Sequence, residues 1–423
     1  MGPRGSVSPS LFSRRRGSTA VGALIVTMAA LSLTACGSSE SPPPPPPPST
    51  ALGSPSPQIR GADLSFTLLE EKAGNKVSEN GKKAPIERIL ADHGANYVRL
   101  RLWVDPAKGY SGSKADTLKL ARRAADAGMK IYLDLHYSDI WADPTYQAIP
   151  ESWDHTRLTV LSGQVRDYTR DVLEEFASQG TPVDMVQLGN EVSAGILWPL
   201  GKLDDSLPGG GWPGFLALLR AGAAGVHDAE LSGPAAGHPV RIAIHTDRID
   251  DPDGLRGWVE HLRTGKVPFD LVSLSYYAFW QGPMSKLGAA MDELARGLGI
   301  DVLVTETAYP WTLEGGNPLL GIAEVAKLPE ADHFPPTPAG QIAYFEALRT
   351  LISQVPDGHG LGFIDWEPGW LPGVGAHPGE DSILANVTMF DYEGRMLPVV
   401  ATAFAPPGRG TPGTPSAAVT PGR

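Results

Sequence analysis

Two glutamates, Glu191 and Glu306, are the residues of this sequence best suited to paired acid–base chemistry. Glu191 directly follows Asn190 in MVQLGNEVSAGILWP, after an apolar run with the pattern of a strand, and Glu306 lies in TETAYPW after another such run. Where two carboxyl groups flank one glycosidic bond, one protonates the departing oxygen and the other attacks the anomeric carbon or activates water. A separation of about 5 to 5.5 Å between the carboxyl groups would give retention of configuration.

The surroundings of Glu191 fit the acid of such a pair. An apolar strand would hold its side chain rigidly, and a poorly solvated site would keep the carboxyl protonated. A single glutamate at a strand end is more often an ordinary loop charge, and Asn190 has the residue type of a turn. The hypothesis therefore depends on what the other strand ends carry.

Apolar strand-like runs alternate with helical patterns through the middle of the chain. The predicted strands are Ala62–Phe66, Tyr97–Trp103, Lys130–His136, Met185–Gly189, Arg241–His245, Leu271–Tyr276, Val302–Thr305 and Leu361–Asp365, and the predicted helices are Thr117–Ala127, Gly163–Ser178, Gly214–Ala224, Met284–Arg296 and Ala339–Ser353. Regular alternation of this kind predicts an α/β fold, a (β/α)8 TIM barrel forming a single catalytic domain. A doubly wound open sheet is the rival, but the first strand-to-helix turn has no glycine-rich phosphate fingerprint.

Active sites of such barrels lie at the carboxyl ends of the strands, and here those ends are rich in polar and aromatic residues. Aromatic planes beside hydrogen-bonding groups suit sugar rings, so we expect a carbohydrate ligand. The predicted substrate-binding residues are Arg101, Asp134, His136, Trp141, Asn190, His245, Tyr276, Trp311 and Trp366. Arg99 and Arg101 share one face of their strand by alternation, which predicts that at least one pairs with a carboxylate inside the barrel.

Other chemistries lack their sequence signatures. The histidines are not arranged as H-E-x-x-H, so no catalytic metal is predicted, and no G-x-S-x-G elbow supports a serine hydrolase. The formal net charge of −12 would repel phosphate backbones, so we expect no nucleic-acid partner. A hydrophobic content of 42% is ample for a large core and excludes global disorder.

Seven segments in preserved order, from Gly61 to about Pro398, resemble the glycoside hydrolase family 53 endo-β-1,4-galactanases. They are GADLSF, NYVRLRLWVDP, YLDLHYSDIWADP, QLGNEVSAGILWP, SYYAFW, TETAYPWT and GLGFIDWEPGWLP. The resemblance implies a retaining barrel enzyme that cleaves internal β-1,4-galactosidic bonds of galactan or type I arabinogalactan. It also implies Glu191 as acid/base, Glu306 as nucleophile, and Asn190 as hydrogen-bond partner of the sugar 2-hydroxyl.

The segment LEGGNPLLGIAEVAKLPEADHFPPTPAG departs from the family pattern. Bacterial members often bind a structural calcium here through an acidic, Asp-rich loop. This segment has fewer clustered oxygen ligands than a hard cation requires; Asp332 and His333 within it, and Asp381 in a later loop, are the residues that could contribute. We therefore expect no required cofactor, and calcium is left open as a structural ion.

The N-terminal residues 1–35 have the pattern of a secretory leader. Arg14 to Arg16 are followed by an apolar stretch, 20–33, that is short for a membrane span, and Leu33-Thr34-Ala35-Cys36 resembles a bacterial lipobox. Cys36 is the only cysteine, so we expect it to be lipidated and to be the sole attachment to a membrane; an ordinary leader with a chance cysteine is the alternative.

The remaining segments complete the predicted organisation. Residues 36–60 form a Pro/Ser-rich spacer, 61–404 the catalytic domain, and 405–423 a tail of disordered composition. This arrangement predicts an exported, monomeric lipoprotein at the cell surface, from which the domain could be shed.

Two other functions remain open. One is an enzyme of the same clan that acts on another β-linked polysaccharide such as mannan, because strand-end carboxylates do not reveal which epimer is accepted. The other is a lipid-anchored, non-catalytic sugar-binding protein. Such proteins need aromatic residues, but they do not need two convergent glutamates.

Overall fold

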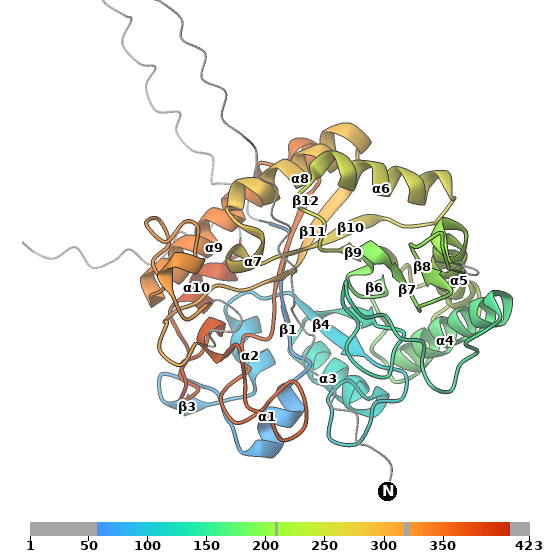
Figure 1. Ribbon diagram of the computed structural model, residues 1–423. Helices are drawn as coiled ribbons and strands as arrows, with labels where there is room; N and C mark the ends of the chain where they lie inside the picture. Colours follow the sequence, from blue (N-terminus) through green and yellow to red (C-terminus); the bar gives the residue numbers. More distant parts are fainter. Residues whose placement is uncertain (1–56, 208–209, 317–321, 407–423) are drawn as a thin grey trace, which may run out of the picture. The chain divides into compact units, whose positions relative to one another are not determined.

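The computed structural model describes residues 57–207, 210–316 and 322–406. Eight parallel strands close into a barrel in the order β1-β12-β11-β10-β9-β6-β5-β4 (Figure 1). These strands are β1 (Ile59–Asp63), β4 (Tyr97–Leu102), β5 (Lys130–Leu135), β6 (Met185–Leu188), β9 (Arg241–Thr246), β10 (Leu271–Tyr276), β11 (Asp301–Thr307) and β12 (Gly360–Asp365). The predicted (β/α)8 barrel is confirmed.

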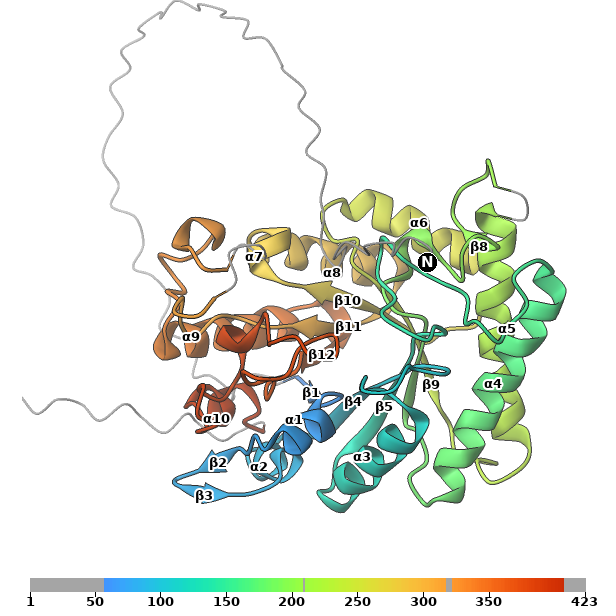
Figure 2. The same cartoon turned by 60° about the horizontal axis from the view of Figure 1, so that its bottom comes forward.

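Helices cover the outside of the strands, as Figure 2 shows for α3, α4 and α5. The α-helices are α1 (Thr67–Ala73), α2 (Ile86–Asp92), α3 (Lys114–Asp126), α4 (Leu158–Ser178), α5 (Gly211–Leu231), α6 (Pro252–Thr264), α7 (Ala278–Gln281), α8 (Met284–Leu298), α9 (Pro338–Ser353) and α10 (Val399–Ala403). Two short hairpins, β2 (Ser78–Glu79) with β3 (Lys82–Lys83) and β7 (Gly195–Ile196) with β8 (Gly201–Lys202), belong to loops.

Local sequence explains where several helices begin. The hydroxyl of Ser113 accepts a hydrogen bond from the backbone N–H of Asp116 at the start of α3. At the start of α6, the carboxylate of Asp251 caps the helix and Pro252 takes a first-turn position, where its missing N–H costs nothing. These caps fix where each strand-to-helix loop ends.

The barrel interior contains an apolar layer, and polar side chains follow it toward the carboxyl ends of the strands. The apolar cluster is Ile59, Tyr97, Tyr132, Met185, Ala243, Leu271, Leu303, Leu361 and Ile364. Because side chains alternate along a strand, Tyr132, Asp134 and His136 face the same side, which places polar groups above the apolar cluster. This stacking carries the polar residues to the carboxyl ends of the strands.

The structure differs from the sequence-based prediction in some boundaries. The first strand is β1, Ile59–Asp63, which ends before Phe66; Phe66 instead precedes α1. Helices α1, α2, α7 and α10 are short and were not among the helical candidates named from the sequence. Helix α6 was also not named, although its buried residues Leu255, Trp258, Val259 and Leu262 have helical spacing.

The predicted leader, Cys36, most of the spacer and most of the tail lie outside the described residues. Within the described ranges, no helix combines the length and apolar character needed to span a membrane.

Candidate active site

Glu191 follows β6 in a left-handed backbone conformation, with φ of 46°. One carboxylate oxygen, Oε1, accepts a hydrogen bond of 2.6 Å from the hydroxyl of Ser275 on β10. The backbone N–H of Glu191 donates to Nδ1 of His245 on β9 over 3.3 Å. Neighbouring strands therefore hold Glu191 by both its main chain and its side chain.

Glu306 lies on β11 and is 7% exposed. Its Oε1 is 3.0 Å from Nη1 of Arg99, and its Oε2 accepts a hydrogen bond of 3.0 Å from the hydroxyl of Tyr277. Both carboxylate oxygens thus have fixed partners, which sets the orientation of the carboxyl group.

The two glutamates meet at the same barrel opening. Ser275, which bonds to Glu191, is the register partner of Glu306 across the β10–β11 pair. The register shifts between Leu274 and Ser275, so that Glu306 rather than Thr305 pairs with Ser275. A shift of this kind re-aims a side chain at the rim of a barrel.

The environment separates the acidities of the two carboxyl groups. Burial, followed by the charges of Glu306 and Asp247, raises the pKa of Glu191 well above its ordinary value. Burial also raises the pKa of Glu306, to about 7, but the Arg99 guanidinium opposes the increase. Glu191 is therefore the group that keeps its proton and Glu306 the group that ionises first.

Arg99 is the centre of a buried charge network, which confirms the prediction of an arginine paired inside the barrel. The side chain is 1% exposed. Nη1 donates to Asp63 over 2.7 Å and Nη2 donates to Asp134 over 2.8 Å, in addition to the contact with Glu306. The cation is thus compensated by carboxylates from three strands, as a buried charge requires.

Asp134, on β5, and His136, directly after β5, belong to the same network of buried charges. Burial alone would raise the pKa of Asp134, but Arg99 and His136 outweigh it and lower the pKa below its usual range. Nε2 of His136 is 2.9 Å from Asp134, while Nδ1 accepts from the indole N–H of Trp103 over 3.1 Å. Asp134 is fully buried, so it positions Arg99 rather than contacting a ligand.

Asn190 is held with one donor hydrogen to spare. Its Oδ1 accepts from Nη2 of Arg99 over 3.0 Å, and its Nδ2 donates to the carbonyl of Ala142 over 2.9 Å. An amide nitrogen carries two hydrogens. The second one is available to a ligand beside Glu191.

Arg101 requires a correction to the predicted set. It is 1% exposed and donates to Ser111 over 2.6 Å, and its guanidinium carbon lies 4.1 Å from the ring centre of Trp141. Phe66 and Trp103 lie around the same cation at 4.9 and 5.0 Å. Arg101 is therefore enclosed by aromatic rings and is not accessible to a sugar, because its strand position directs it behind Trp141.

Tyr276 also does not belong to the site. Its side chain is fully buried, its hydroxyl donates to the carbonyl of Gly282, and its ring stacks on Tyr344 of α9. Strand alternation turns Tyr276 toward the helices and the neighbouring residue Ser275 toward the interior. The next tyrosine, Tyr277, supplies the phenol that reaches Glu306.

The other predicted aromatic residues keep partly exposed rings. Trp141 donates its indole N–H to the carbonyl of Ala376, Trp366 packs edge-on against Trp370, and Trp311 packs against Tyr392. All three are intermediate in burial, and they remain predicted sugar contacts.

Sequence reasoning missed Ser275, Tyr277 and the role of Glu367. Glu367 follows β12 with φ of 50° and accepts from the backbone N–H of Phe66 over 3.2 Å. In SYYAFW, strand alternation predicts that Ser275 and Tyr277 share a face, and this is the signal that could have found both. Nothing in the local sequence indicates that Glu367 reaches Phe66.

The described residues contain no group of three or more His, Cys, Asp or Glu side chains placed to hold a metal. Asp381, which was considered for calcium, accepts from the backbone N–H groups of Gly373 and Ser382. Its Oδ1 thus caps a loop. The segment considered for calcium includes residues 317–321, which lie outside the described ranges.

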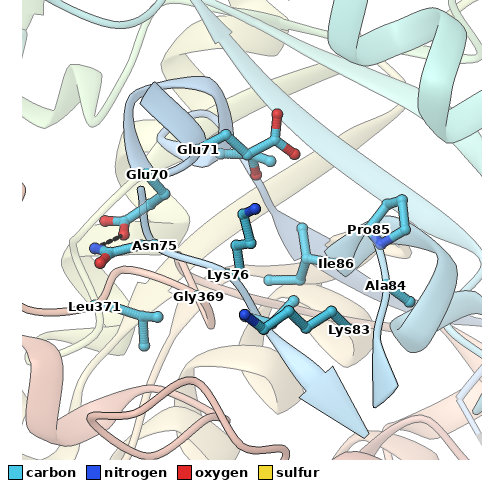
Figure 3. A pocket seen from close by; sticks show the side chains of 12 residues that line it. Glu70, Glu71, Asn75, Lys76, Lys83, Ala84, Pro85, Ile86, Gly369 and Leu371 are labelled. Atoms are coloured by element: carbon cyan, nitrogen blue, oxygen red, sulfur yellow. Dashed lines mark hydrogen bonds between the residues drawn. The ribbon is translucent and has the colours of Figure 1, made fainter. Parts of the chain in front are cut away.

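A separate cavity of about 350 Å³ lies between α1, the β2–β3 hairpin and the segment after β12 (Figure 3). Its walls include Lys76, Ile86 and Leu371, and none of the predicted site residues lines it. Glu70, in its wall, accepts a hydrogen bond of 2.6 Å from Asn75, while burial raises the pKa of Glu70 to about 8.

Glu70→Gln is expected to stabilise the protein at neutral and mildly alkaline pH. Because the folded-state pKa is raised, Glu70 does not affect the free energy of unfolding below about pH 4, where it is protonated in both states. As pH rises toward 8, it lowers the free energy of unfolding progressively. We expect a gain on the order of 1 to 3 kcal/mol at pH 8 and none at pH 4, measured by denaturant unfolding. Glu71→Gln, at an exposed neighbour paired with Arg123, is the control and should lack this gain.

A closed barrel carries two carboxyl groups at its strand ends, partly exposed Glu191 with a raised pKa and buried Glu306 held by arginine and tyrosine, and this arrangement is that of a barrel glycoside hydrolase. The family model for glycosyl hydrolase family 53 matches residues 59–403, and the chain belongs to this family.

Relatives and solved structures agree with this membership. The arabinogalactan endo-β-1,4-galactanase A of Emericella nidulans is 36% identical over 343 residues, covering 79% of this chain and 92% of the relative. The family 53 catalytic domain of Ignisphaera aggregans has a TM-score of 0.75 at 29% identity, covering 84% of this chain and 98% of that one. A fungal β-1,4-galactanase structure has a TM-score of 0.70 at 31% identity, covering 82% and 99%.

Proposed function

We propose that this protein is a retaining endo-glycosidase that hydrolyses internal β-1,4-galactosidic bonds of galactan or type I arabinogalactan. The observation that carries the proposal is the placement of Glu191 and Glu306 on either side of Ser275 at one barrel opening. The activity for which these relatives are named supports galactan as the substrate. The fold itself does not select the sugar.

In the first step, the Glu306 carboxylate attacks the anomeric carbon and forms a glycosyl ester. The bond to the leaving oxygen breaks at the same time, and that oxygen takes the proton from Glu191. In the second step, ionised Glu191 removes a proton from water, whose oxygen displaces Glu306 from the anomeric carbon. Two inversions at one carbon give net retention.

The neighbouring residues would position the sugar. The second N–H of the Asn190 amide, beside the one that bonds to Ala142, would bond the 2-hydroxyl, a contact that strengthens in the transition state. The exposed parts of Trp141, Trp311 and Trp366 are proposed to stack on sugar rings. His136 and His245 act through their buried hydrogen bonds to other side chains.

Release of reducing ends from a panel of polysaccharides tests the substrate. We expect activity on galactan and arabinogalactan and at most trace activity on mannan and cellulose. Mannan as the best substrate would leave the catalytic assignment intact and overturn the substrate. Tight galactan binding without any hydrolysis would favour the sugar-binding alternative.

Tyr277→Phe is expected to lower kcat/KM about 10- to 100-fold, because a hydrogen bond to a charged group is lost. The tyrosine stabilises ionised Glu306, so its loss should raise the pKa of Glu306 and move the acidic limb of the pH profile to higher pH. Tyr276→Phe is a matched control, because its hydroxyl bonds only to a carbonyl on the helix side. Equal effects of the two changes would contradict the role of Tyr277.

The localisation proposed from the sequence is a cell-surface lipoprotein. The mature chain would begin at a lipidated Cys36, followed by the proline-rich spacer, and the enzyme would act as a monomer. Mass spectrometry of the N-terminal peptide distinguishes lipid-modified Cys36 from an unmodified chain cut elsewhere.

A further inference from the structure

Ser275 connects two groups of the site that have no direct side-chain bond. Its hydroxyl oxygen lies 2.9 Å from Nε2 of His245 and 2.6 Å from Oε1 of Glu191. Ser275 is 1% exposed and His245 is fully buried, so water does not compete for the contact between them. The three residues belong to adjacent positions of the barrel wall, at β6, β9 and β10.

The tautomer of His245 decides which atoms donate in the hydrogen bonds that link His245, Ser275 and Glu191. The backbone N–H of Glu191 points at Nδ1 of His245, and within the described residues it has no other acceptor. Nε2 of Gln187, a second donor, lies 3.1 Å from Nδ1. Oδ1 of Asn190 lies 2.9 Å from Nδ1 and already accepts from Arg99 and from Gln187. Nδ1 is therefore the acceptor and Nε2 carries the hydrogen.

That tautomer leaves one arrangement for the serine. Nε2–H of His245 donates to Ser275, so the hydroxyl hydrogen of Ser275 can only be donated onward to Glu191. Burial, followed by the charge of Arg99, lowers the pKa of His245 well below its usual value, so the ring stays neutral and holds this tautomer.

The titratable groups that face Glu191 either raise its pKa or do not change it. Glu306 on β11, Asp247 after β9 and Asp143 after β5 all raise the pKa of Glu191. The phenol of Tyr277 is engaged by Glu306. Within the described part of the chain, the Ser275 hydroxyl is the one hydrogen-bond donor that contacts the Glu191 carboxyl group.

We propose that Ser275, oriented by neutral His245, is a positioning residue that holds Oε1 of Glu191 and leaves Oε2 to carry the transferred proton. This inference rests on the proposed function. In the first step it directs the acidic proton toward the leaving oxygen. In the second step the serine hydrogen bond stabilises the carboxylate that must accept a proton from water.

Ser275→Ala tests the proposal through the pH dependence of kcat/KM on galactan. Loss of the donor raises the pKa of Glu191, and the acid must be protonated to act, so the alkaline limb should move upward by about one pH unit. On an aryl β-galactobioside with a nitrophenol leaving group, which needs no acid, the first step should be little changed.

Ser273→Ala, two residues earlier on the same face of β10, is the matched control, because among the described residues the Ser273 hydroxyl is bonded only to the Tyr132 hydroxyl, at 3.4 Å. Ser275→Thr, which keeps the hydroxyl, should retain the wild-type limb. Should the alanine variant fail to fold, the isosteric pair Ser275→Thr and Ser275→Val makes the same comparison.

An alkaline limb that is unchanged in Ser275→Ala, or in Ser275→Val beside Ser275→Thr, overturns the inference while galactan hydrolysis stands. A wild-type protein that does not hydrolyse galactan overturns the proposed function instead. The two failures are therefore distinguishable in one set of measurements.

Discussion

Glu306→Gln is expected to reduce turnover of β-1,4-galactan by at least about three orders of magnitude, because an amide cannot form the glycosyl ester. The change is nearly isosteric and removes one negative charge from beside Arg99. The remaining contact with Tyr277 can still be made by the amide oxygen, so the fold should be retained. Steady-state release of reducing ends, with circular dichroism as the check on folding, measures the effect.

A matched control and a rescue make this prediction specific. Glu314→Gln changes an exposed glutamate in the loop after the same strand and should leave turnover unchanged. In Glu306→Ala, a small anion such as azide can occupy the space of the missing carboxylate and attack the anomeric carbon once. One displacement inverts the centre, so an α-galactosyl azide should accumulate when an activated aryl β-galactoside is supplied. Equal turnover by Glu306→Gln and wild type would defeat the assignment of Glu306 as nucleophile.

The barrel was predictable because its strands are marked by the sequence itself. Runs such as YVRLRL and KIYLDL are apolar on both faces or alternate strongly, and each is followed by a helical pattern. The first strand was placed three residues late, because Ala62–Phe66 (ADLSF) is more apolar than Ile59–Asp63 (IRGAD), and only the pairing with β12 shows the true strand. Short helices such as α1 depend on tertiary packing and leave little local pattern.

The site was predictable at the level of strand ends and not at the level of side-chain partners. Glu191 and Glu306 could be chosen because paired carboxylates at barrel strand ends have one well-understood chemistry. Arg101 and Tyr276 were misplaced for a physical reason. Arg101 faces the barrel interior, as alternation predicts, but Trp141 covers it. Alternation itself turns Tyr276 toward the helices, where its ring packs on Tyr344.

The support of the acid by its neighbours could not be inferred from one sequence. The bond from Ser275 to Glu191 joins β10 to β6, and the bond from Tyr277 to Glu306 depends on the chain leaving the strand at that point. Such contacts follow from barrel closure and from the register shift beside Ser275. Strand alternation places Ser275 and Tyr277 on one face, but residue type and spacing do not reveal the register shift that sets their partners.

Glu191→Gln is expected to separate the two chemical steps. On galactan, whose leaving group is a poor one, loss of the acid should lower kcat about 10²- to 10⁴-fold. On an aryl β-galactobioside with a nitrophenol leaving group, formation of the glycosyl ester on Glu306 should proceed, because the phenolate departs without a proton. Hydrolysis of that ester should be slow, since no base activates water, and a burst of nitrophenol should precede a low steady rate.

Azide then distinguishes a missing acid/base from general damage to the site. As an anionic nucleophile it needs no base, so it should restore the steady rate of Glu191→Gln and give a β-galactosyl azide, the anomer opposite to that from Glu306→Ala. The control Glu151→Gln, at an exposed glutamate in the loop after β5, should show neither the burst nor the rescue. If Glu191→Gln lost activity equally on both substrates without rescue by azide, Glu191 would be a structural residue and the acid would have to be sought among its neighbours Asp247 and Asp143.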